Sequence, residues 1–130
     1  VKHKDFLKEI ISELKAEKIR TSIFVDTEFK NIEGAVLTGT DRVELYTEPY
    51  AAGFEKNKEK AVEPFVKAGE LALKLGLGLN AGHDLSLQNL KYFVQNVKGI
   101  SEVSIGHALI SDALYFGLDN TIKLYLRELA

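Results

Sequence analysis

Residues 76–107 read GLGLNAGHDLSLQNLKYFVQNVKGISEVSIGH and predict one strand-helix-strand unit. The first strand is expected at Gly78–Ala81, and Asp84 can cap a helix that continues through Val97. A second strand is expected at Val103–Ile105. Two strands joined by a crossover helix are typical of a parallel sheet.

The same alternation covers the rest of the chain. Further elements are expected at these residues: helices 5–18, 28–37, 57–75 and 112–129, and strands 21–26 and 42–47. Residues 48–53, with Pro49 and Gly53, are expected to form a loop. Pro64 should kink the helix at 57–75 or lie near its start, and Gly76 should end it in a left-handed cap. The fold class is therefore α/β with parallel strands.

Apolar residues recur at three- and four-residue spacing in the first and last of these helices, so we expect both stripes to face the core. The stripes comprise Phe6, Leu7, Ile10, Ile11 and Leu14, and Leu114, Leu118, Ile122, Tyr125 and Leu126. No linker-like segment interrupts the chain, which predicts one domain over residues 1–130.

Four strand-helix units can form a small open sheet or half of a closed (β/α)₈ barrel. A whole barrel needs about 200–250 residues, and this sequence has 130. Because unpaired strand edges favour association, half a barrel should dimerise or be part of a longer polypeptide.

Composition argues against several classes of partner. Lys and Arg total 17 against 19 Asp and Glu, so no excess positive charge favours nucleic acid. The absence of cysteine excludes disulfides, thiolate nucleophiles and cysteine-ligated metals. No apolar run approaches the length of a membrane span or a secretory signal, so we expect a cytoplasmic protein with no membrane partner.

Two consecutive strands end in a Gly-His pair, Gly82-His83 and Gly106-His107. Glycine lets a ligand approach the backbone, and an imidazole can transfer protons near neutral pH. Since ligands bind beyond the carboxyl ends of parallel strands, the repeated pair predicts a site for a phosphorylated substrate. A single histidine here would more often be structural, and His3, in a charged segment, is expected to be solvated.

Glu44 interrupts an otherwise apolar strand. If Val43 and Leu45 face the helices, Glu44 faces the barrel interior, although a charge reaching solvent at a strand edge is an equal alternative. Asp26, at the end of the first strand, is expected to be a structural cap. The sequence contains no GxGxxG, Walker, HExxH or GxSxG motif, which argues against the nucleotide-binding, zinc-protease and hydrolase classes.

The chain resembles the C-terminal half of the pyridoxine 5′-phosphate synthase family. The resemblance rests on four motifs at matching separations: Ser22–Asp26, Val43–Thr47 with Tyr50-Ala51, Leu79–His83 (LNAGH) and Val103–Ala108 (VSIGHA). It implies a TIM-type barrel of which this chain supplies the last four strand-helix units. It also implies condensation of 1-deoxy-D-xylulose 5-phosphate with 3-amino-2-oxopropyl phosphate to pyridoxine 5′-phosphate, phosphate and water, without a metal or cofactor.

The resemblance implies roles for five residues. His83 resembles the family's proton donor and Glu44 the group that stabilises charge in the transition state. Gly106, His107 and the backbone at Asp84 resemble contacts to the aminoketone phosphate. Family members form homo-oligomers, octamers among them, so assembly is expected here too.

The sequence departs from the family at two places. Asp84 stands where glycine is usual, which should weaken phosphate binding unless the carboxylate caps the following helix. Tyr46-Thr47-Glu48 stands where His-Thr-Gly is common. The family's remaining catalytic histidine and glutamate, and the arginines for the second phosphate, belong to its N-terminal half, so residues 1–130 alone should be inactive.

The alternatives are a non-catalytic α/β module that binds a phospho-ligand or mediates assembly, and a complete open-sheet regulatory domain. In the module, the Gly-His pairs would only shape loops, and His83→Ala would leave turnover unchanged. A regulatory domain would be a cooperatively folding monomer, whereas half a barrel should self-associate.

Overall fold

The computed structural model describes residues 3–130 and contains a four-stranded parallel sheet in the order β1-β2-β3-β4. The strands are β1 (Ser22–Val25), β2 (Arg42–Tyr46), β3 (Gly78–His83) and β4 (Ile100–Ile105). Each strand pairs with the next strand in sequence, as the alternation predicts. The α/β class and the parallel sheet are therefore confirmed.

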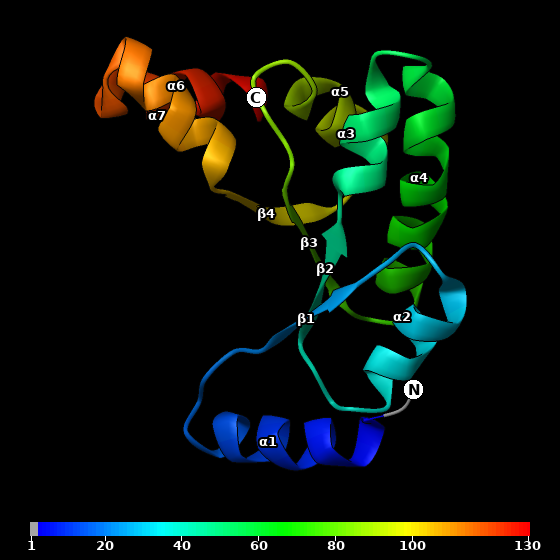
Figure 1. Ribbon diagram of the computed structural model, residues 1–130. Coiled ribbons are helices and arrows are strands. Elements are labelled where there is room, and N and C mark those ends of the chain that lie inside the picture. Colours follow the sequence, from blue (N-terminus) through cyan, green and yellow to red (C-terminus); the bar gives the residue numbers. More distant parts are fainter. Residues whose placement is uncertain (1–2) are drawn as a thin grey trace.

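The helices cover one face of the sheet and both of its ends. They are α1 (Lys4–Ala16), α2 (Phe29–Val36), α3 (Glu48–Phe54), α4 (Lys58–Lys74), α5 (Leu90–Asn96), α6 (His107–Phe116) and α7 (Leu118–Glu128). Figure 1 shows α2, α3, α4 and α5 on one side of the sheet, with α1 at one end and α6 and α7 at the other. The opposite face of the sheet is open between these ends.

The core lies between the sheet and the helices. Val43, Leu45, Leu79 and Ala81 point toward the helices and are fully buried. They pack with apolar residues of α2, α4 and α5 in one continuous cluster. Val43 and Leu45 thus behave as the strand alternation predicts, and the other face is left for polar side chains.

Within the paired segment, β4 contains one residue more than β3. Leu79 pairs with Ile100, but Asn80 pairs with Glu102, so Ser101 is an extra residue in β4. The insertion lets Ile100, Val103 and Ile105 all pack against the core. A bulge of this kind changes which face the following residues occupy.

The prediction of a loop at 48–53 is wrong, because α3 occupies this segment. Pro49 lies in the first turn, where its missing N–H costs no helical hydrogen bond. Tyr50 is fully buried and donates a hydrogen bond to the Asn89 carbonyl (2.7 Å). Its ring contacts Phe65 and Phe93. Tertiary packing of one aromatic side chain therefore overrides the turn composition.

Helix α4 runs through Pro64 and begins well before it. Asn57 caps the helix by accepting a hydrogen bond from the Lys60 N–H (2.7 Å). At the other end, Gly76 has φ +79°, and the N–H groups of Gly76 and Leu77 donate to the carbonyls of Leu73 and Ala72. The predicted left-handed cap is therefore confirmed as a Schellman motif.

Two helix boundaries differ from prediction. The helix expected from Asp84 begins only at Leu90, so Asp84 does not cap it. The helix expected at 112–129 is two helices, α6 and α7, separated by Gly117 with φ +77°. A glycine in this conformation ends a helix without the strain a side chain would introduce.

The apolar stripes expected to be core are largely exposed at both ends of the molecule. In α1, Phe6 is 62% exposed and only Ile11 is buried, while Leu114 in α6 is 83% exposed and Leu126 in α7 is 58% exposed. Tyr125 is the member of the last stripe that is buried, at 4%. The prediction therefore holds for Ile11 and Tyr125 and fails for the exposed positions, which no other part of residues 3–130 covers.

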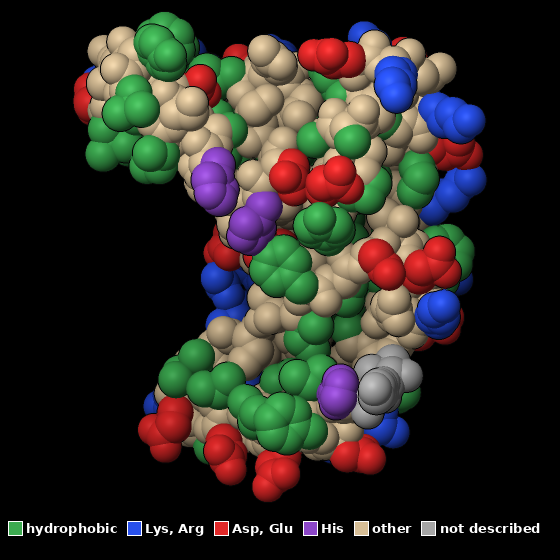
Figure 2. Space-filling view, in the orientation of Figure 1, with side chains coloured by type: hydrophobic (Ala, Val, Ile, Leu, Met, Phe, Trp, Pro, Cys, Tyr) green, Lys and Arg blue, Asp and Glu red, His purple; other side chains and the backbone are tan. Residues whose placement is uncertain are grey.

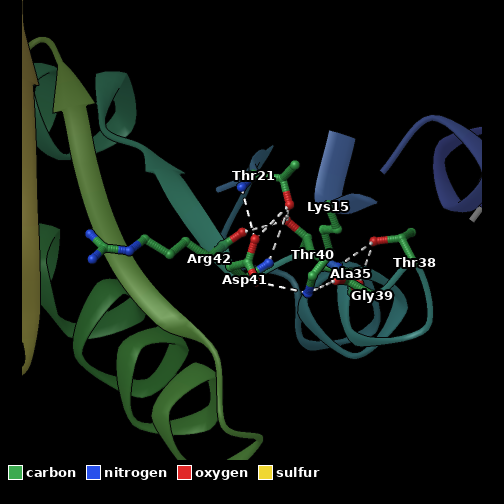
Figure 3. Close-up of polar contacts among 8 residues, drawn as sticks. All are labelled: Lys15, Thr21, Ala35, Thr38, Gly39, Thr40, Asp41 and Arg42. Atoms are coloured by element: carbon green, nitrogen blue, oxygen red, sulfur yellow. Dashed lines mark hydrogen bonds and ion pairs between the residues drawn. The ribbon is translucent and has the colours of Figure 1, made fainter. Parts of the chain in front are cut away.

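A polar cluster fixes the amino ends of β1 and β2 (Figure 3). Asp41 accepts hydrogen bonds from the Thr21 N–H (2.8 Å) and hydroxyl (3.0 Å) and pairs with the Lys15 ammonium (2.8 Å). Lys15 also donates to the Gly39 carbonyl (2.9 Å). The Lys15 and Thr21 donors lower the pKa of Asp41 from 3.8 to about 2. This cluster attaches α1 to the amino ends of the strands, and the Gly-His pairs lie at the opposite, carboxyl ends.

Candidate active site

Two rows of residues on the open face of the sheet form the candidate site. Register places Phe24, Glu44, Asn80 and Glu102 side by side in the first row. Tyr46, Gly82 and Ser104 form the second row, closer to the carboxyl ends of the strands. This is the face that lines the interior when a parallel sheet closes into a barrel.

A network of charged and amide groups links Asn80 and Glu102 of the first row to two arginines nearer the amino ends of the strands. Arg42 donates to the Asn80 amide oxygen (2.9 Å) and lies 3.3 Å from the Glu102 carboxylate. Asn80 donates to the other Glu102 oxygen (3.2 Å), and Arg20 binds Glu102 at 2.6 Å. The Arg20 hydrogen bond lowers the pKa of Glu102. The network holds β2, β3 and β4 together beneath the carboxyl-terminal row.

Glu44 lies in the middle of β2 and is 8% exposed, which excludes a charge reaching solvent at a strand edge. One carboxylate oxygen accepts a long hydrogen bond from the Ser104 hydroxyl (3.4 Å). The other oxygen, Oε1, is buried and has no hydrogen-bond partner among residues 3–130. It lies 3.7 Å from Nδ1 of His83. A buried carboxylate oxygen without a donor is costly, so this atom is well placed to accept a hydrogen bond from a ligand.

Gly82 provides the space for this carboxylate. A Cβ atom at Gly82 would lie 2.4 Å from the Ser104 carbonyl oxygen and 2.9 Å from Glu44 Oε1. Its neighbours in β2 and β4 would have to move to admit any side chain. The glycine before His83 is therefore required by the packing of the site, in addition to any role in ligand approach.

His83 ends β3 in an unusual backbone conformation, with φ +82°. A non-glycine residue in this region costs about 1–3 kcal/mol, so the conformation persists only where the surrounding contacts offset this strain. The imidazole lies 5.0 Å from the Phe24 ring, centroid to centroid, and its side chain is 54% exposed. The ring thus lies between the buried Glu44 carboxylate and solvent.

The segment around His83 is held by residues on either side. Thr47, fully buried just after β2, donates to the Gly82 carbonyl and accepts from the Asp84 N–H (3.4 Å). Asn89 donates to the Asp84 carbonyl (3.2 Å) and accepts from the Ser86 N–H (2.8 Å). The loop after β3 is therefore fixed by buried polar groups.

Gly106 and His107 follow β4 directly. Gly106 is the N-cap residue of α6, and a Cβ atom there would contact nothing within 4 Å. In the described chain, no side chain caps the amino end of α6, and its first turn carries no acidic residue. The free N–H groups of such a helix end attract anions.

Four of the five predicted site residues lie at the carboxyl ends of β3 and β4, and Glu44, in the middle of β2, reaches His83 at 3.7 Å. Because β3 and β4 are parallel and His83 pairs with Ile105, His83 and His107 follow neighbouring strand ends. Figure 2 shows two histidine side chains close together on the hollowed side of the molecule, near carboxylates. Asp84 follows His83, but its N–H already points to Thr47.

The residues without an assigned role also have clear positions. Asp26 accepts hydrogen bonds from the Glu28 N–H (3.1 Å) and the Asn31 amide (2.8 Å), which confirms it as a structural cap. His3 is exposed, as predicted.

Sequence reasoning missed Thr47, Ser104 and the network of Arg20, Arg42, Asn80 and Glu102. Their signal was present as polar residues alternating with apolar ones, Asn80 with Leu79 and Ala81, and Ser104 with Val103 and Ile105. Recognising it requires the register between strands, which depends on the bulge at Ser101.

Two features are absent from residues 3–130. No group of three or more His, Cys, Asp or Glu side chains in this range is arranged to hold a metal ion. No helix in the same range is long and apolar enough to cross a membrane.

Comparisons with known proteins all indicate the same protein family. Residues 1–130 match the family model described as pyridoxal phosphate biosynthesis protein PdxJ. The pyridoxine 5′-phosphate synthase of Christiangramia forsetii is 60% identical over 129 residues, which cover 99% of this chain and 54% of the relative. The synthases of Flavobacterium johnsoniae and Cytophaga hutchinsonii are 57% and 58% identical, with the same coverage. The chain spans about half the length of the curated relatives it matches.

Proposed function

The chain belongs to the PdxJ family of pyridoxal phosphate biosynthesis proteins, and from this we propose that it acts in a pyridoxine 5′-phosphate synthase. In this proposal, residues 1–130 form the C-terminal half of a (β/α)₈ barrel domain. The coverage of about half of each relative and the open sheet with two unpaired edges both support this assignment.

The proposed reaction joins 1-deoxy-D-xylulose 5-phosphate to 3-amino-2-oxopropyl phosphate and releases phosphate and water. It proceeds through imine formation, phosphate elimination, hydration and ring closure, and each step moves protons at fixed positions. It is a synthase of the transferase class that needs no metal or cofactor. The substrates are small and phosphorylated, and neither nucleic acid nor a membrane takes part.

One observation carries the assignment of His83 and Glu44. The unpartnered Oε1 of buried Glu44 lies 3.7 Å from His83 Nδ1, and the imidazole is also exposed toward the open face. We assign His83 as the proton donor, because its ring can reach both a substrate and the carboxylate. Glu44 stabilises the positive charge that develops on the imine in the transition state.

The aminoketone phosphate is assigned to the amino end of α6. There Gly106 leaves the backbone open, and the N–H groups of the first turn favour an anion. His107, exposed at the same position, adds a donor. The Asp84 backbone is a weaker candidate, because its N–H donates to Thr47 and its carboxylate does not cap α5.

The proposal extends to the state of the protein. Residues 1–130 alone are expected to be inactive, because the N-terminal half of the barrel supplies the remaining catalytic groups. The whole enzyme is expected to be a cytoplasmic homo-oligomer, an octamer if it follows the family. The exposed apolar faces of α1, α6 and α7 are compatible with such contacts.

The test uses a chimera in which residues 1–130 replace the matching part of the C. forsetii synthase. Product formation is measured with both substrates. We expect His83→Ala and Glu44→Gln each to reduce kcat at least about a hundredfold, since general acid catalysis contributes about 10²–10⁴-fold. His3→Ala, which removes an exposed histidine far from the candidate site, should leave kcat unchanged.

Turnover that is unchanged in His83→Ala would contradict the proposal and favour a non-catalytic module. Turnover by residues 1–130 alone, at the rate of the chimera, would contradict the half-barrel assignment. Circular dichroism of each variant separates loss of chemistry from loss of fold.

A further inference from the structure

The strained conformation of His83 requires a group that imposes it. With φ +82°, the backbone at His83 turns in a direction that a side chain disfavours. The peptide groups on its two sides are the Gly82 carbonyl and the Asp84 N–H. Both of them contact one side chain, the hydroxyl of Thr47.

Thr47 is suited to this task by its burial and its chemistry. Its side chain is fully buried, so water does not compete for the hydroxyl. The hydroxyl donates to the Gly82 carbonyl and accepts from the Asp84 N–H (3.4 Å), which uses both of its capacities. A single oxygen thus bridges the backbone across His83 and restricts its rotation.

Thr47 also lies on the segment that carries Glu44. Thr47 directly follows β2, three positions after Glu44 in the middle of that strand, while His83 belongs to β3. The Thr47 bridge therefore sets the position of the imidazole relative to the carboxylate, whose Oε1 lies 3.7 Å from Nδ1. The Phe24 ring, 5.0 Å from the imidazole, supports the ring from the β1 side.

We propose that Thr47 is a positioning residue that holds His83 in its left-handed backbone conformation and thereby aims the imidazole at Glu44. The catalytic consequence rests on the function proposed above. The structural consequence does not, because it concerns only the backbone at His83.

The experiment compares Thr47→Val, which removes the hydroxyl at nearly constant shape, with Thr47→Ser, which keeps it. Both are made in the chimera. Thr121→Val is the matched control, because Thr121 is equally buried and its hydroxyl also donates to a backbone carbonyl, that of Gly117. Crystal structures give the φ angle of His83, and steady-state kinetics give kcat and KM.

We expect Thr47→Val to release His83 to a negative φ and to lower kcat about tenfold to a hundredfold, since an error of about 1 Å in a catalytic group has effects of this size. KM should change little. Thr47→Ser should retain the left-handed φ and most of kcat, and Thr121→Val should match the parent chimera. If Thr47→Val does not fold, Thr47→Ala removes the hydroxyl without placing a methyl group against the carbonyl.

Three results would overturn the proposal: an unchanged His83 φ in the variants that lack the hydroxyl, equal loss of kcat in Thr47→Ser and Thr47→Val, or full activity in Thr47→Val. A parent chimera that folds but makes no product would instead count against the proposed function. The φ angle of His83 in the variants would still decide the role of Thr47.

Discussion

Gly82→Ala is expected to destabilise the protein and displace the candidate catalytic carboxylate. The added Cβ would lie 2.4 Å from the Ser104 carbonyl oxygen, 2.9 Å from the Ser104 Cβ and 2.9 Å from Glu44 Oε1. An ordinary carbon–oxygen contact is about 3.3 Å or longer. The backbone of β4 must therefore retreat by roughly 1 Å, and Glu44 must shift as well.

The obstacle is a paired strand rather than the end of a flexible side chain, so the cost should reach the upper part of the range for overpacking, about 3 kcal/mol. For a protein of the size of the relatives, this lowers Tm by about 6–12 °C. The shift of the carboxylate should also reduce kcat at least about tenfold.

The assay is thermal unfolding of the chimera, followed by circular dichroism, with Gly53→Ala as the control. A Cβ at Gly53 would approach only the Ala61 methyl closely, at 3.1 Å, and the change gains about 1 kcal/mol of helix propensity in α3. Its Tm should stay close to that of the parent. Equal Tm values for the two variants would refute the argument that Gly82 is required by close packing of β2, β3 and β4.

Two further predictions concern stability. Asp41→Asn should remove a pH-dependent contribution to the free energy of unfolding. The pKa of Asp41 is lowered from 3.8 to about 2 in the folded protein, so its carboxylate stabilises the fold above about pH 4. This stabilisation is lost as the pH falls toward 2. The Asp41 side chain is about a third exposed, so screening limits the effect to about 1 kcal/mol. The free energy of unfolding should therefore differ less between pH 6 and pH 2 in the variant than in the parent. An equal difference in the two proteins would contradict a stabilising role for the Asp41 carboxylate. Tyr125→Phe should cost about 1 kcal/mol by removing the bond to Asp112 (2.8 Å) that joins α7 to α6. Exposed Tyr115→Phe is its control, and equal Tm values for the two would argue against a contribution from the Asp112 bond.

The sequence predicts the elements whose signals are local. The short apolar strands, the cap at Gly76 and the alternation that turns Glu44 away from Val43 and Leu45 all follow from nearest neighbours, and all are present. The helix at 48–54 could not be predicted this way, because burial of Tyr50 against Phe65 and Phe93 decides it.

In the candidate site, too, the sequence identifies single residues but not the long-range contacts that surround them. The Gly-His pairs and Glu44 stand out in the sequence, and the structure brings them together near the carboxyl ends of the strands. Their surroundings could not be inferred, since the contact of Thr47 with residues 82–84 joins positions more than thirty residues apart. Likewise, the exposure of Leu114 depends on what covers α6, which a hydrophobic stripe alone does not reveal.

The extra residue in β4 makes the length of this strand more important than its composition. Ser101 allows Ile100 and Val103 to share the hydrophobic side of the sheet although an odd number of steps separates them. Many replacements at Ser101 should be tolerated, since the side chain is exposed. A one-residue deletion would instead bring either Ile100 or the segment from Glu102 onward onto the wrong side, and would draw Gly106 and His107 back by about 3.3 Å. Relatives that keep the chemistry should therefore vary in sequence along this strand but not in the number of residues that it contains.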